Sequence, residues 1–462
     1  MKRVEITEVI DSARYVGLPL GITILTICIT LVDGYDLQTM SFVAPELVTD
    51  WRIDRSLLAP VLTGSLIGMA LGSLALGWLG DRIGRKKSFV LCTVFLFVGS
   101  LLSASATALP ELFAWRVLTG IGLGGVTPLA ATLISEWTPA RTRSVAVACA
   151  VVAIPLGGMG GAQVAHWIIP LYGWRMIFYV GAALPLVVCV LAWAALPESP
   201  KFLVHRPARG HELARALNRL MGERRFDGTE VFHIDEPQPP HGSGFFVILQ
   251  PAYLRTTLLL WVAFACNTLA LYAFVNWLPT IITSIGLPRA TGLQSSTFFN
   301  FGGFFGAVGG AVLIRYVGSR AVSAALATIG AIATVFIGAT LSGVSGDPEA
   351  RLFLLVALAG ASLNGMQCFI YAVGAHSYPT YVRGAAVGCA QTVSRLGGVL
   401  SSAIAGAYFA LQPALPVSAF FYVVAGAILV VVATFSSLRT HISIRKDKST
   451  PGAPVIHEGA PP

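Results

Sequence analysis

The sequence contains few charged residues. Asp, Glu, Lys and Arg make up 11% of its 462 residues, whereas hydrophobic residues make up 55%. Soluble domains carry about 25% charged residues, because they need polar side chains to cover a surface that faces water. This shortage argues against a soluble enzyme, a disordered chain and a disulfide-rich scaffold. We therefore expect lipid to cover most of the surface.

Cysteine is sparse, and several sequence signatures of chemistry are absent. The seven cysteines stand singly in apolar stretches, without the CxxC or Cys/His spacing that zinc or a disulfide framework requires. The sequence has no GxxxxGK[ST] phosphate loop and no HExxH motif. The charged segment 1–17 has no small-residue cleavage site, so we do not expect a removable signal peptide. We predict no cofactor, no metal, no enzymatic activity and no direct nucleotide-driven pumping.

Twelve apolar segments are long enough to cross a membrane. A helix of about 20 residues spans the ~30 Å hydrocarbon layer. Six such segments precede a polar stretch from Pro197 to Gln250, and six follow it. We therefore predict an all-α integral membrane protein with twelve transmembrane helices. The predicted spans are 18–41, 57–79, 88–108, 110–135, 144–166, 175–196, 256–282, 295–315, 321–342, 352–376, 385–409 and 417–438.

Positive charge is distributed unevenly among the connections between the spans. When alternate connections are assigned to opposite sides, one side holds 24 of the 31 Lys and Arg residues and the other holds five. The remaining two, Arg116 and Arg395, fall within spans. Because basic loops stay in the cytoplasm, we predict that both termini and the central loop are cytoplasmic. The net charge of +9 then reflects topology and does not indicate a nucleic-acid partner.

The two halves of the sequence match at an offset of 240 residues. Pro139–Arg143 aligns with Pro379–Arg383, and Gly157-Gly158 aligns with Gly397-Gly398. Such a run indicates duplicated six-helix bundles with a binding site between them near the bilayer midplane. The predicted domains are an N-terminal bundle (1–196), a central loop (197–250) with a surface helix near 211–220, a C-terminal bundle (251–440) and a disordered tail (441–462).

The connection after the second span reads Gly77-Trp-Leu-Gly-Asp81-Arg82-Ile-Gly84-Arg85-Lys86-Lys87. This spacing resembles the cytoplasmic loop signature of the major facilitator superfamily, whose fold has twelve helices in two bundles. The resemblance implies a gate that forms and breaks as the bundles rock. The corresponding segment after the eighth span departs from the signature, because Arg315 stands near the place of the acid. The residues assigned to the gate are Gly77, Asp81, Arg82, Gly84 and Arg85.

An arginine, Arg116, opens the segment Arg116-Val-Leu-Thr-Gly120-Ile-Gly122-Leu-Gly124-Gly125 inside the fourth span. The segment contains GxGxxG, but no strand precedes it, so it does not indicate a dinucleotide site. It resembles the fourth-helix motif of the superfamily. Because an arginine in hydrocarbon must face a partner or a watery cavity, we interpret Arg116 as functional.

Two acids, Asp33 and Asp36, lie three residues apart in the first span and share one helix face. Both lie about 21–26 Å from the cytoplasmic end, a depth that overlaps that of Arg116. A low-dielectric environment favours the protonated carboxyl group and a nearby arginine favours the ionised one, so a competing anion would switch between them. We predict that both acids couple transport to protons. The alternative is a structural ion pair between one acid and Arg116.

Three segments indicate one branch of the superfamily. Leu31-Val-Asp33-Gly-Tyr35-Asp36 resembles the first-helix signature of the aromatic acid:proton symporters, which import benzoate-like anions. Asn276-Trp277-Leu-Pro279-Thr280 resembles the end of their seventh helix. The segment from Tyr378 to Arg383, followed by Arg395-Leu-Gly397, resembles their late signature. The resemblance extends from about residue 18 to residue 438.

The second intramembrane arginine, Arg395, lies roughly 16 Å into its span. A planar guanidinium pairs with a carboxylate through two hydrogen bonds, and aromatic side chains nearby offer stacking surfaces. The alternative is an arginine satisfied by backbone carbonyls. We also assign Glu136 and His376, which match at the offset of 240, to a possible proton path, with a surface pair as the alternative. The substrate-binding residues that we assign are Arg116, Arg395, Tyr35, Asn276, Trp277 and Tyr371.

These features together predict a monomeric transporter in a bacterial inner membrane that imports an aromatic acid anion with protons. A sugar-type porter or a drug/proton antiporter on the same fold is the nearest alternative. A membrane receptor for aromatic acids belongs to another class. It needs a cytoplasmic output domain, for which segment 197–250 is short.

Overall fold

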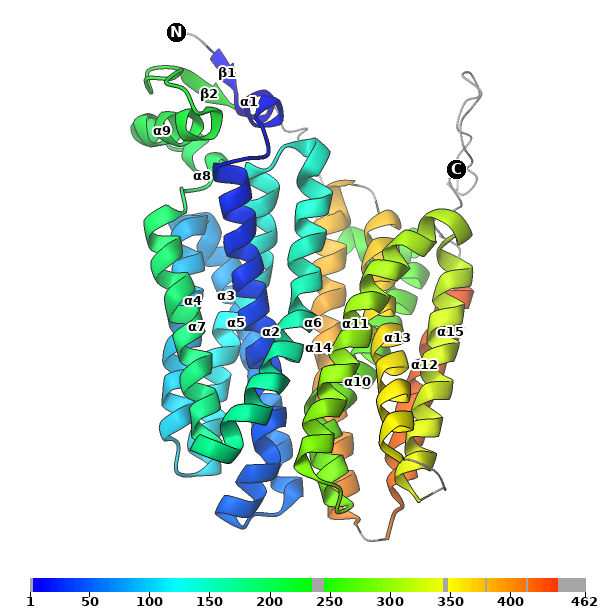
Figure 1. Cartoon of the computed structure of the whole chain (residues 1–462). Helices are drawn as coiled ribbons and strands as arrows, with labels where there is room; N and C mark the ends of the chain where they lie inside the picture. Colours follow the sequence, from blue (N-terminus) through cyan, green and yellow to red (C-terminus); the bar gives the residue numbers. More distant parts are fainter. Residues whose placement is uncertain (1–2, 235–244, 344–347, 379, 413, 439–462) are drawn as a thin grey trace.

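The computed structural model describes residues 3–234, 245–343, 348–378, 380–412 and 414–438. Figure 1 shows two groups of long, roughly parallel helices side by side. The first group, the N half, contains α2 (Leu18–Trp51), α3 (Leu58–Ile83), α4 (Arg85–Ser105), α5 (Leu109–Trp137), α6 (Ala140–Tyr172) and α7 (Arg175–Ala195). The second group, the C half, contains α10 (Pro251–Ser284), α11 (Arg289–Val317), α12 (Ser319–Leu341), α13 (Pro348–His376), α14 (Thr380–Ala410) and α15 (Val417–Ser437).

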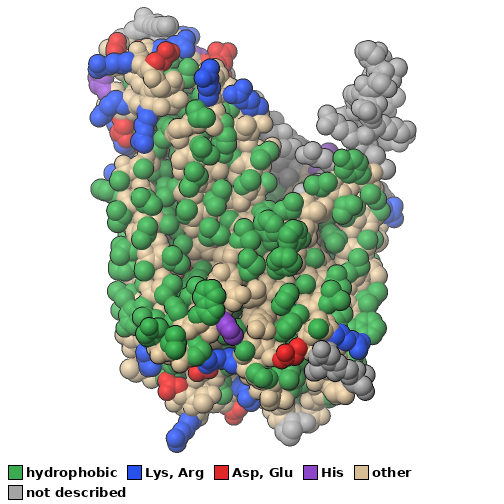
Figure 2. Space-filling model, viewed as in Figure 1, with side chains coloured by type: hydrophobic (Ala, Val, Ile, Leu, Met, Phe, Trp, Pro, Cys, Tyr) green, Lys and Arg blue, Asp and Glu red, His purple; other side chains and the backbone are tan. Residues whose placement is uncertain are grey.

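The predicted all-α membrane fold is confirmed. Over the described residues, ten of these helices are long and apolar enough to cross a membrane. Figure 2 shows hydrophobic side chains over the body of the bundle and charged side chains mostly at its two ends. The first span is longer than predicted, because α2 continues past residue 41 to Trp51 and ends where Arg52 adopts a left-handed conformation (φ 52°). The prediction counted only hydrocarbon thickness, whereas the helix extends beyond that layer.

A small subdomain, here called the cap, lies at one end of the N half (Figure 1). It contains β1 (Arg3–Glu5), α1 (Ile6–Ser12), α8 (Pro200–Val204), α9 (Gly210–Met221) and β2 (Val231–His233). The strands β1 and β2 pair in parallel, which ties the start of the chain to the central loop. Leu213, Leu217 and Leu220 are buried against the cap and the N half, so the predicted surface helix is confirmed as α9. The predicted disordered tail (441–462) lies outside the described residues.

Glycines at matching positions show how the two halves repeat. A Cβ on Gly68 would lie 2.1 Å from the carbonyl oxygen of Val117, and one on Gly302 would lie 1.9 Å from that of Ala357. The same holds between the first and fifth helices of each half, where Gly157 meets the Leu31 carbonyl and Gly397 meets the Ala265 carbonyl, both at 2.0 Å. Only glycine permits such close crossing of helix backbones.

These contacts fix the register between the halves. The first two helices of each half match at an offset of 234 residues, as Gly68 and Gly302 do. The fourth and fifth helices match at 240, as Gly157 and Gly397 do. The predicted internal repeat is therefore confirmed, with a second offset that the sequence comparison missed.

The apolar core divides at the capped end, which is the end of the bundle that carries the cap. One cluster of buried hydrophobic residues joins both halves and lies toward the opposite end, where α2 ends and α3 begins. Toward the capped end, the N half and the C half have separate clusters. Figure 2 shows the surface hollowed between the halves on that side. The halves are therefore packed together at the opposite end and separate toward the capped end.

Candidate functional site

Asp36 and Arg116 form a closed ion pair inside the N half. The Nη1 and Nη2 atoms of Arg116 donate to Oδ1 and Oδ2 of Asp36 at 3.1 and 2.9 Å. Each residue is 1% exposed. The Nε atom of Arg116 donates to Ser65, and the Ser100 hydroxyl donates to Asp36. Because these contacts all come from the N half, the structure holds this pair away from the gap between the halves.

Three of the predicted substrate-binding residues also lie in packed surroundings. The hydroxyl of Tyr35 donates to the carbonyl of Ile177 at 2.8 Å, within the N half. Asn276 and Trp277 are buried on α10 toward the opposite end. The Trp277 ring lies 5.5 Å from that of Phe409. The structure therefore does not bring these three residues together with Arg395.

Asp33 and Arg395 lie at matching depths on opposite halves. Each is fifteen residues from the capped end of its helix, α2 or α14, which is roughly 22 Å along the axis. The Oδ2 atom of Asp33 accepts a hydrogen bond from Thr127 at 2.9 Å. Arg395 donates to the hydroxyl of Ser73 on α3, across the gap. Asp33 and Arg395 are near enough to interact electrostatically, but each is bonded to another residue, Thr127 or Ser73, and the two do not form an ion pair.

Two tyrosines of the C half complete this cluster. The phenol of Tyr272 on α10 interacts electrostatically with Asp33, Arg395 and Tyr371. The Tyr371 hydroxyl lies within reach of Gln367, and its ring lies 5.0 Å from that of Phe264. Tyr371 was a predicted residue, whereas Tyr272 was missed. The 234 offset identifies Tyr272 as the equivalent of Gln38, a signal that the sequence comparison at 240 does not reveal.

A pair of amides joining the halves was also missed. Gln38 on α2 and Asn300 on α11 exchange two hydrogen bonds, at 2.8 and 2.9 Å. Each residue is 3% exposed. Neither belongs to a motif, and they are 262 residues apart, so no local signal in the sequence pairs them.

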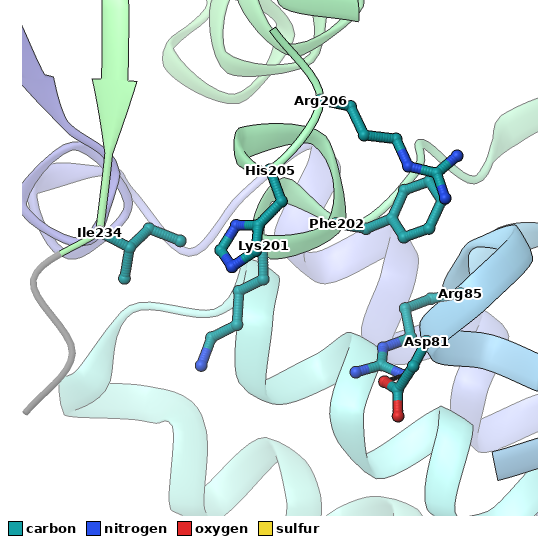
Figure 3. Close-up of a pocket in the computed structure, with 7 residues that line it drawn as sticks. All are labelled: Asp81, Arg85, Lys201, Phe202, His205, Arg206 and Ile234. Atoms are coloured by element: carbon teal, nitrogen blue, oxygen red, sulfur yellow. Dashed lines mark hydrogen bonds and ion pairs between the residues drawn. The ribbon is translucent and has the colours of Figure 1, made fainter. Parts of the chain in front are cut away.

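The predicted gate residues lie beside the cap. Arg85 pairs with Asp81 and lies 3.9 Å from Glu136. Figure 3 shows Asp81 and Arg85 beside the α8 residues Lys201 and Phe202, around a cavity of about 520 Å³. All the residues that line this cavity belong to the N half or the cap. In this conformation Asp81 is 67% exposed, and its ion pair stays within the N half.

Two further gate residues fix the turn between α3 and α4. Gly84 has a φ of 108°, a conformation that favours glycine, and its missing Cβ leaves space for the Glu198 carboxylate. The carbonyl of Arg82 accepts a hydrogen bond from Arg206 at 2.7 Å. A Cβ on Gly77 would meet nothing within 4 Å. The side chain of Arg315, in the divergent second signature, lies outside the described residues.

The two candidates for a proton path differ in their surroundings. Glu136 is buried, 5% exposed, near Arg85 in the N half. His376 is exposed at the end of α13 in the C half. Their equivalence by sequence offset therefore places them in corresponding positions of two halves rather than in contact.

Comparison with known proteins identifies the class. Residues 26–402 match the model of the Major Facilitator Superfamily. Among solved structures, the D-xylose–proton symporter superposes with a TM-score of 0.69 at 18% identity, covering 91% of this chain and 96% of that one. The inward-open xylose transporter XylE from E. coli gives a TM-score of 0.70 at 17% identity, covering 94% and 98%. The chain belongs to the major facilitator superfamily of membrane transporters.

Curated relatives narrow the branch within that superfamily. The 4-hydroxybenzoate transporter PcaK of Pseudomonas aeruginosa is 35% identical over 405 residues, covering 87% of this chain and 89% of that protein. The gallate transporter of Pseudomonas putida is 32% identical over 415 residues, covering 89% and 90%. The benzoate transport protein of Acinetobacter baylyi is 26% identical over 417 residues, covering 89% and 88%. The predicted resemblance to the aromatic acid branch is confirmed, and these relatives are transporters and not enzymes.

Proposed function

We propose that this protein imports an aromatic carboxylate anion together with protons across a bacterial inner membrane. The observation that carries the proposal is the placement of Asp33 and Arg395 at one depth on opposite halves, where the core divides. A transporter that rocks two bundles around a midplane site exposes such a pair to each side in turn. The similarity to gallate, 4-hydroxybenzoate and benzoate transporters supports an aromatic acid as the substrate.

The orientation follows from charge. The connections at the capped end carry most of the Lys and Arg residues, which favours the cytoplasm for that side. The proposed domains are those of the sequence prediction, with the cap formed from the N-terminal segment and the central loop. The opposite end then faces the periplasm. In this conformation the hydrophobic cores of the two halves are separate toward the capped end, which is the cytoplasmic side in this proposal. We propose that the protein transports as a monomer.

The C half supplies the groups suited to the substrate. Arg395 presents a forked guanidinium that matches a carboxylate. The hydroxyls of Tyr272 and Tyr371 are near enough to Arg395 to interact with it electrostatically, and both can donate hydrogen bonds. An anion bound there neutralises the charge of Arg395, and a neutralised cation no longer favours the ionised form of carboxyl groups near it.

The N half supplies the proton site. Asp33 accepts one hydrogen bond from Thr127 and interacts electrostatically with Arg395 of the C half, so it is the acid that we assign to proton binding. The side chain of Asp36 accepts two hydrogen bonds from Arg116 and is therefore engaged within the N half in this conformation. Glu136 is a further candidate near the cytoplasmic side, where it lies 3.9 Å from Arg85.

The proposal is tested by uptake into proteoliposomes. An inward acid gradient should drive accumulation of labelled 4-hydroxybenzoate, and a protonophore should abolish it. Asp33→Asn should remove gradient-driven accumulation while the protein still binds the aromatic acid, because the amide oxygen can still accept the hydrogen bond from Thr127 but the amide cannot take up and release a proton. Gradient-driven uptake of xylose but of no aromatic acid would contradict the proposal in favour of a sugar-type porter. Binding without any flux would favour a receptor.

A further inference from the structure

The amides of Gln38 and Asn300 form a reciprocal pair across the two halves. The Nε2 atom of Gln38 donates to Oδ1 of Asn300 at 2.8 Å, and the Nδ2 atom of Asn300 donates to Oε1 of Gln38 at 2.9 Å. Asn300 also donates to the carbonyl of Ser296 on its own helix, at 2.8 Å. The pair is uncharged and fully enclosed, and it joins α2 directly to α11.

A glycine on a third helix makes room for this pair. A Cβ on Gly158 of α6 would lie 2.0 Å from Nε2 of Gln38 and 2.8 Å from Oδ1 of Asn300. Gly160, two residues further along α6, has nothing within 4 Å of such a Cβ. Gly158 is therefore required by contact with the amide pair, and not by a general need for small residues on α6.

The symmetry-related position in the C half has no such pair. Gly398 corresponds to Gly158 and lies against the ring of Tyr272, which corresponds to Gln38, and against Leu66, which corresponds to Asn300. Leu66 provides no hydrogen bond. The contact beside Gly398 is therefore apolar, whereas the equivalent contact beside Gly158 is a pair of hydrogen bonds.

The pair lies farther from the capped end than Asp33 does, at about the depth of Tyr272. Gln38 is five residues beyond Asp33 along α2, about 7 Å farther from the capped end. An ion pair between Glu46 and Arg289 joins the same two helices near their ends on that side. The hydroxyl of Ser41, one turn beyond Gln38, is buried with no hydrogen-bond partner among the described residues. A buried hydroxyl without a partner is unfavourable, which fits a segment that meets water in another conformation.

We propose that Gln38, Asn300 and Gly158 form the outer gate of the transport cycle. The amide pair closes the path between Asp33 and the opposite end while the capped end is open, and it separates when the halves rock the other way. An uncharged pair suits a reversible gate. When it separates, hydrogen bonds between the two amides are replaced by hydrogen bonds to water, and the net free-energy difference is small. This inference rests on the proposed function in one respect, namely that the opposite end faces the periplasm.

The test measures opening of this side directly. Ser41→Cys, in a background without the native cysteines, places a reporter thiol beyond the gate. Right-side-out vesicles are treated with a membrane-impermeant maleimide, and the labelling rate is compared for Gly158→Ala and Gly160→Ala. Gly158→Ala should label about threefold to tenfold faster, as expected for the loss of one or two hydrogen bonds. Gly160→Ala should label at the parental rate.

Equal labelling rates for the two alanine variants would overturn the gate. If Gly158→Ala does not fold, Asn300→Leu replaces it. Asn364→Leu is then the control, because the side chain of Asn364 donates a hydrogen bond to the carbonyl of Gly360 within its own helix. Labelling only by maleimide trapped inside the vesicles would overturn the orientation in the proposed function, and the ratio of the paired rates would still decide the gate. The assay needs no substrate, so failure of aromatic acid transport does not affect it.

Discussion

The two halves share one backbone plan but fill equivalent core positions with opposite chemistry. In the N half, Asp36, Arg116 and Ser65 form a buried ionic cluster. With the offsets fixed by the glycine contacts, these positions correspond to Ala270, Val356 and Phe299 in the C half. Those three residues are apolar and at most 2% exposed. The fold therefore packs this region without charge, and the ion pair of the N half is not needed to fill space.

A second pair of equivalent contacts shows the same division. Asp33 bonds to Thr127 in the N half, and the matching residues of the C half, Asn267 and Gln367, also bond to each other, at 2.6 Å. The geometry is retained while the acid becomes an amide. Among the described residues of this layer, the acids Asp33 and Asp36 belong to the N half, and Arg395, Tyr272 and Tyr371 belong to the C half. This division is what the proposed separation of proton and substrate sites requires.

The largest effect is expected from giving the N half the residues of the C half. Asp36→Ala or Arg116→Val alone leaves the partner charge buried and unpaired, which should destabilise the protein by about 3–5 kcal/mol. The double variant removes both charges and should recover much of that loss, as the Ala270 and Val356 positions do in the C half. Thermal unfolding of the purified protein in detergent measures this order, and each single variant should unfold at a lower temperature than the double variant.

The same variants separate structure from transport. If the ion pair serves coupling, the double variant should be stable yet inactive in gradient-driven uptake. A double variant that transports normally would assign Asp36 and Arg116 to packing alone. Single variants as stable as the parent would contradict the buried, closed state of the pair.

A smaller effect is expected from the substrate groups of the C half. Arg395→Lys loses the forked geometry and should raise the half-saturation concentration for 4-hydroxybenzoate more than about tenfold. Tyr272→Phe keeps the ring and removes one hydroxyl donor to an anion, so an increase of about tenfold or less is expected. Initial uptake rates at fixed pH measure both.

Tyr316→Phe serves as the control, because Tyr316 on α11 is 73% exposed on the surface of the bundle. It should leave the half-saturation concentration unchanged. If Tyr272→Phe behaves like Tyr316→Phe, Tyr272 does not bind the substrate, and the assignment of this role to the C half then depends on Arg395 and Tyr371.

The sequence predicted the elements of the fold better than their contacts. Apolar length gave the helices, and the glycine pairs gave the repeat, because both are local properties of the chain. Asp33 and Arg395 were assigned from the sequence because an ionisable residue inside a hydrophobic run is conspicuous, and the structure places them at matching depths. Gln38, Asn300 and Tyr272 were missed because amides and tyrosines are ordinary in such runs. Their roles arise only from which helices of the two halves meet.

The prediction for the first span did not distinguish the partners of its two acids. Spacing placed Asp33 and Asp36 together, yet they point to different partners, Thr127 and Arg116. Three residues along a helix turn the side chains by about 60° relative to each other, which is enough to separate them once neighbouring helices pack. The alternative of a structural pair with Arg116 therefore describes the geometry of Asp36. Asp33, which is 3% exposed, interacts electrostatically with Arg395 of the other half and stays a predicted coupling residue.

The smallest effect on stability is expected at the gate glycine of α3. A Cβ on Gly68 or Gly72 would lie 2.1 or 2.0 Å from a backbone oxygen of α5, whereas Gly77 on the same helix faces open space. Gly77→Ala should therefore leave stability unchanged or raise it by about 0.5–1 kcal/mol, because alanine favours the helix. The same change should slow transport if α3 approaches the C half closely when the capped end shuts.

Thermal unfolding and uptake rate, measured on one preparation of Gly77→Ala, distinguish these effects. Normal unfolding with slow uptake indicates a closed state that needs glycine at this position. Normal unfolding and normal uptake would remove Gly77 from the predicted gate at the capped end and leave Asp81 and Arg85 assigned to it.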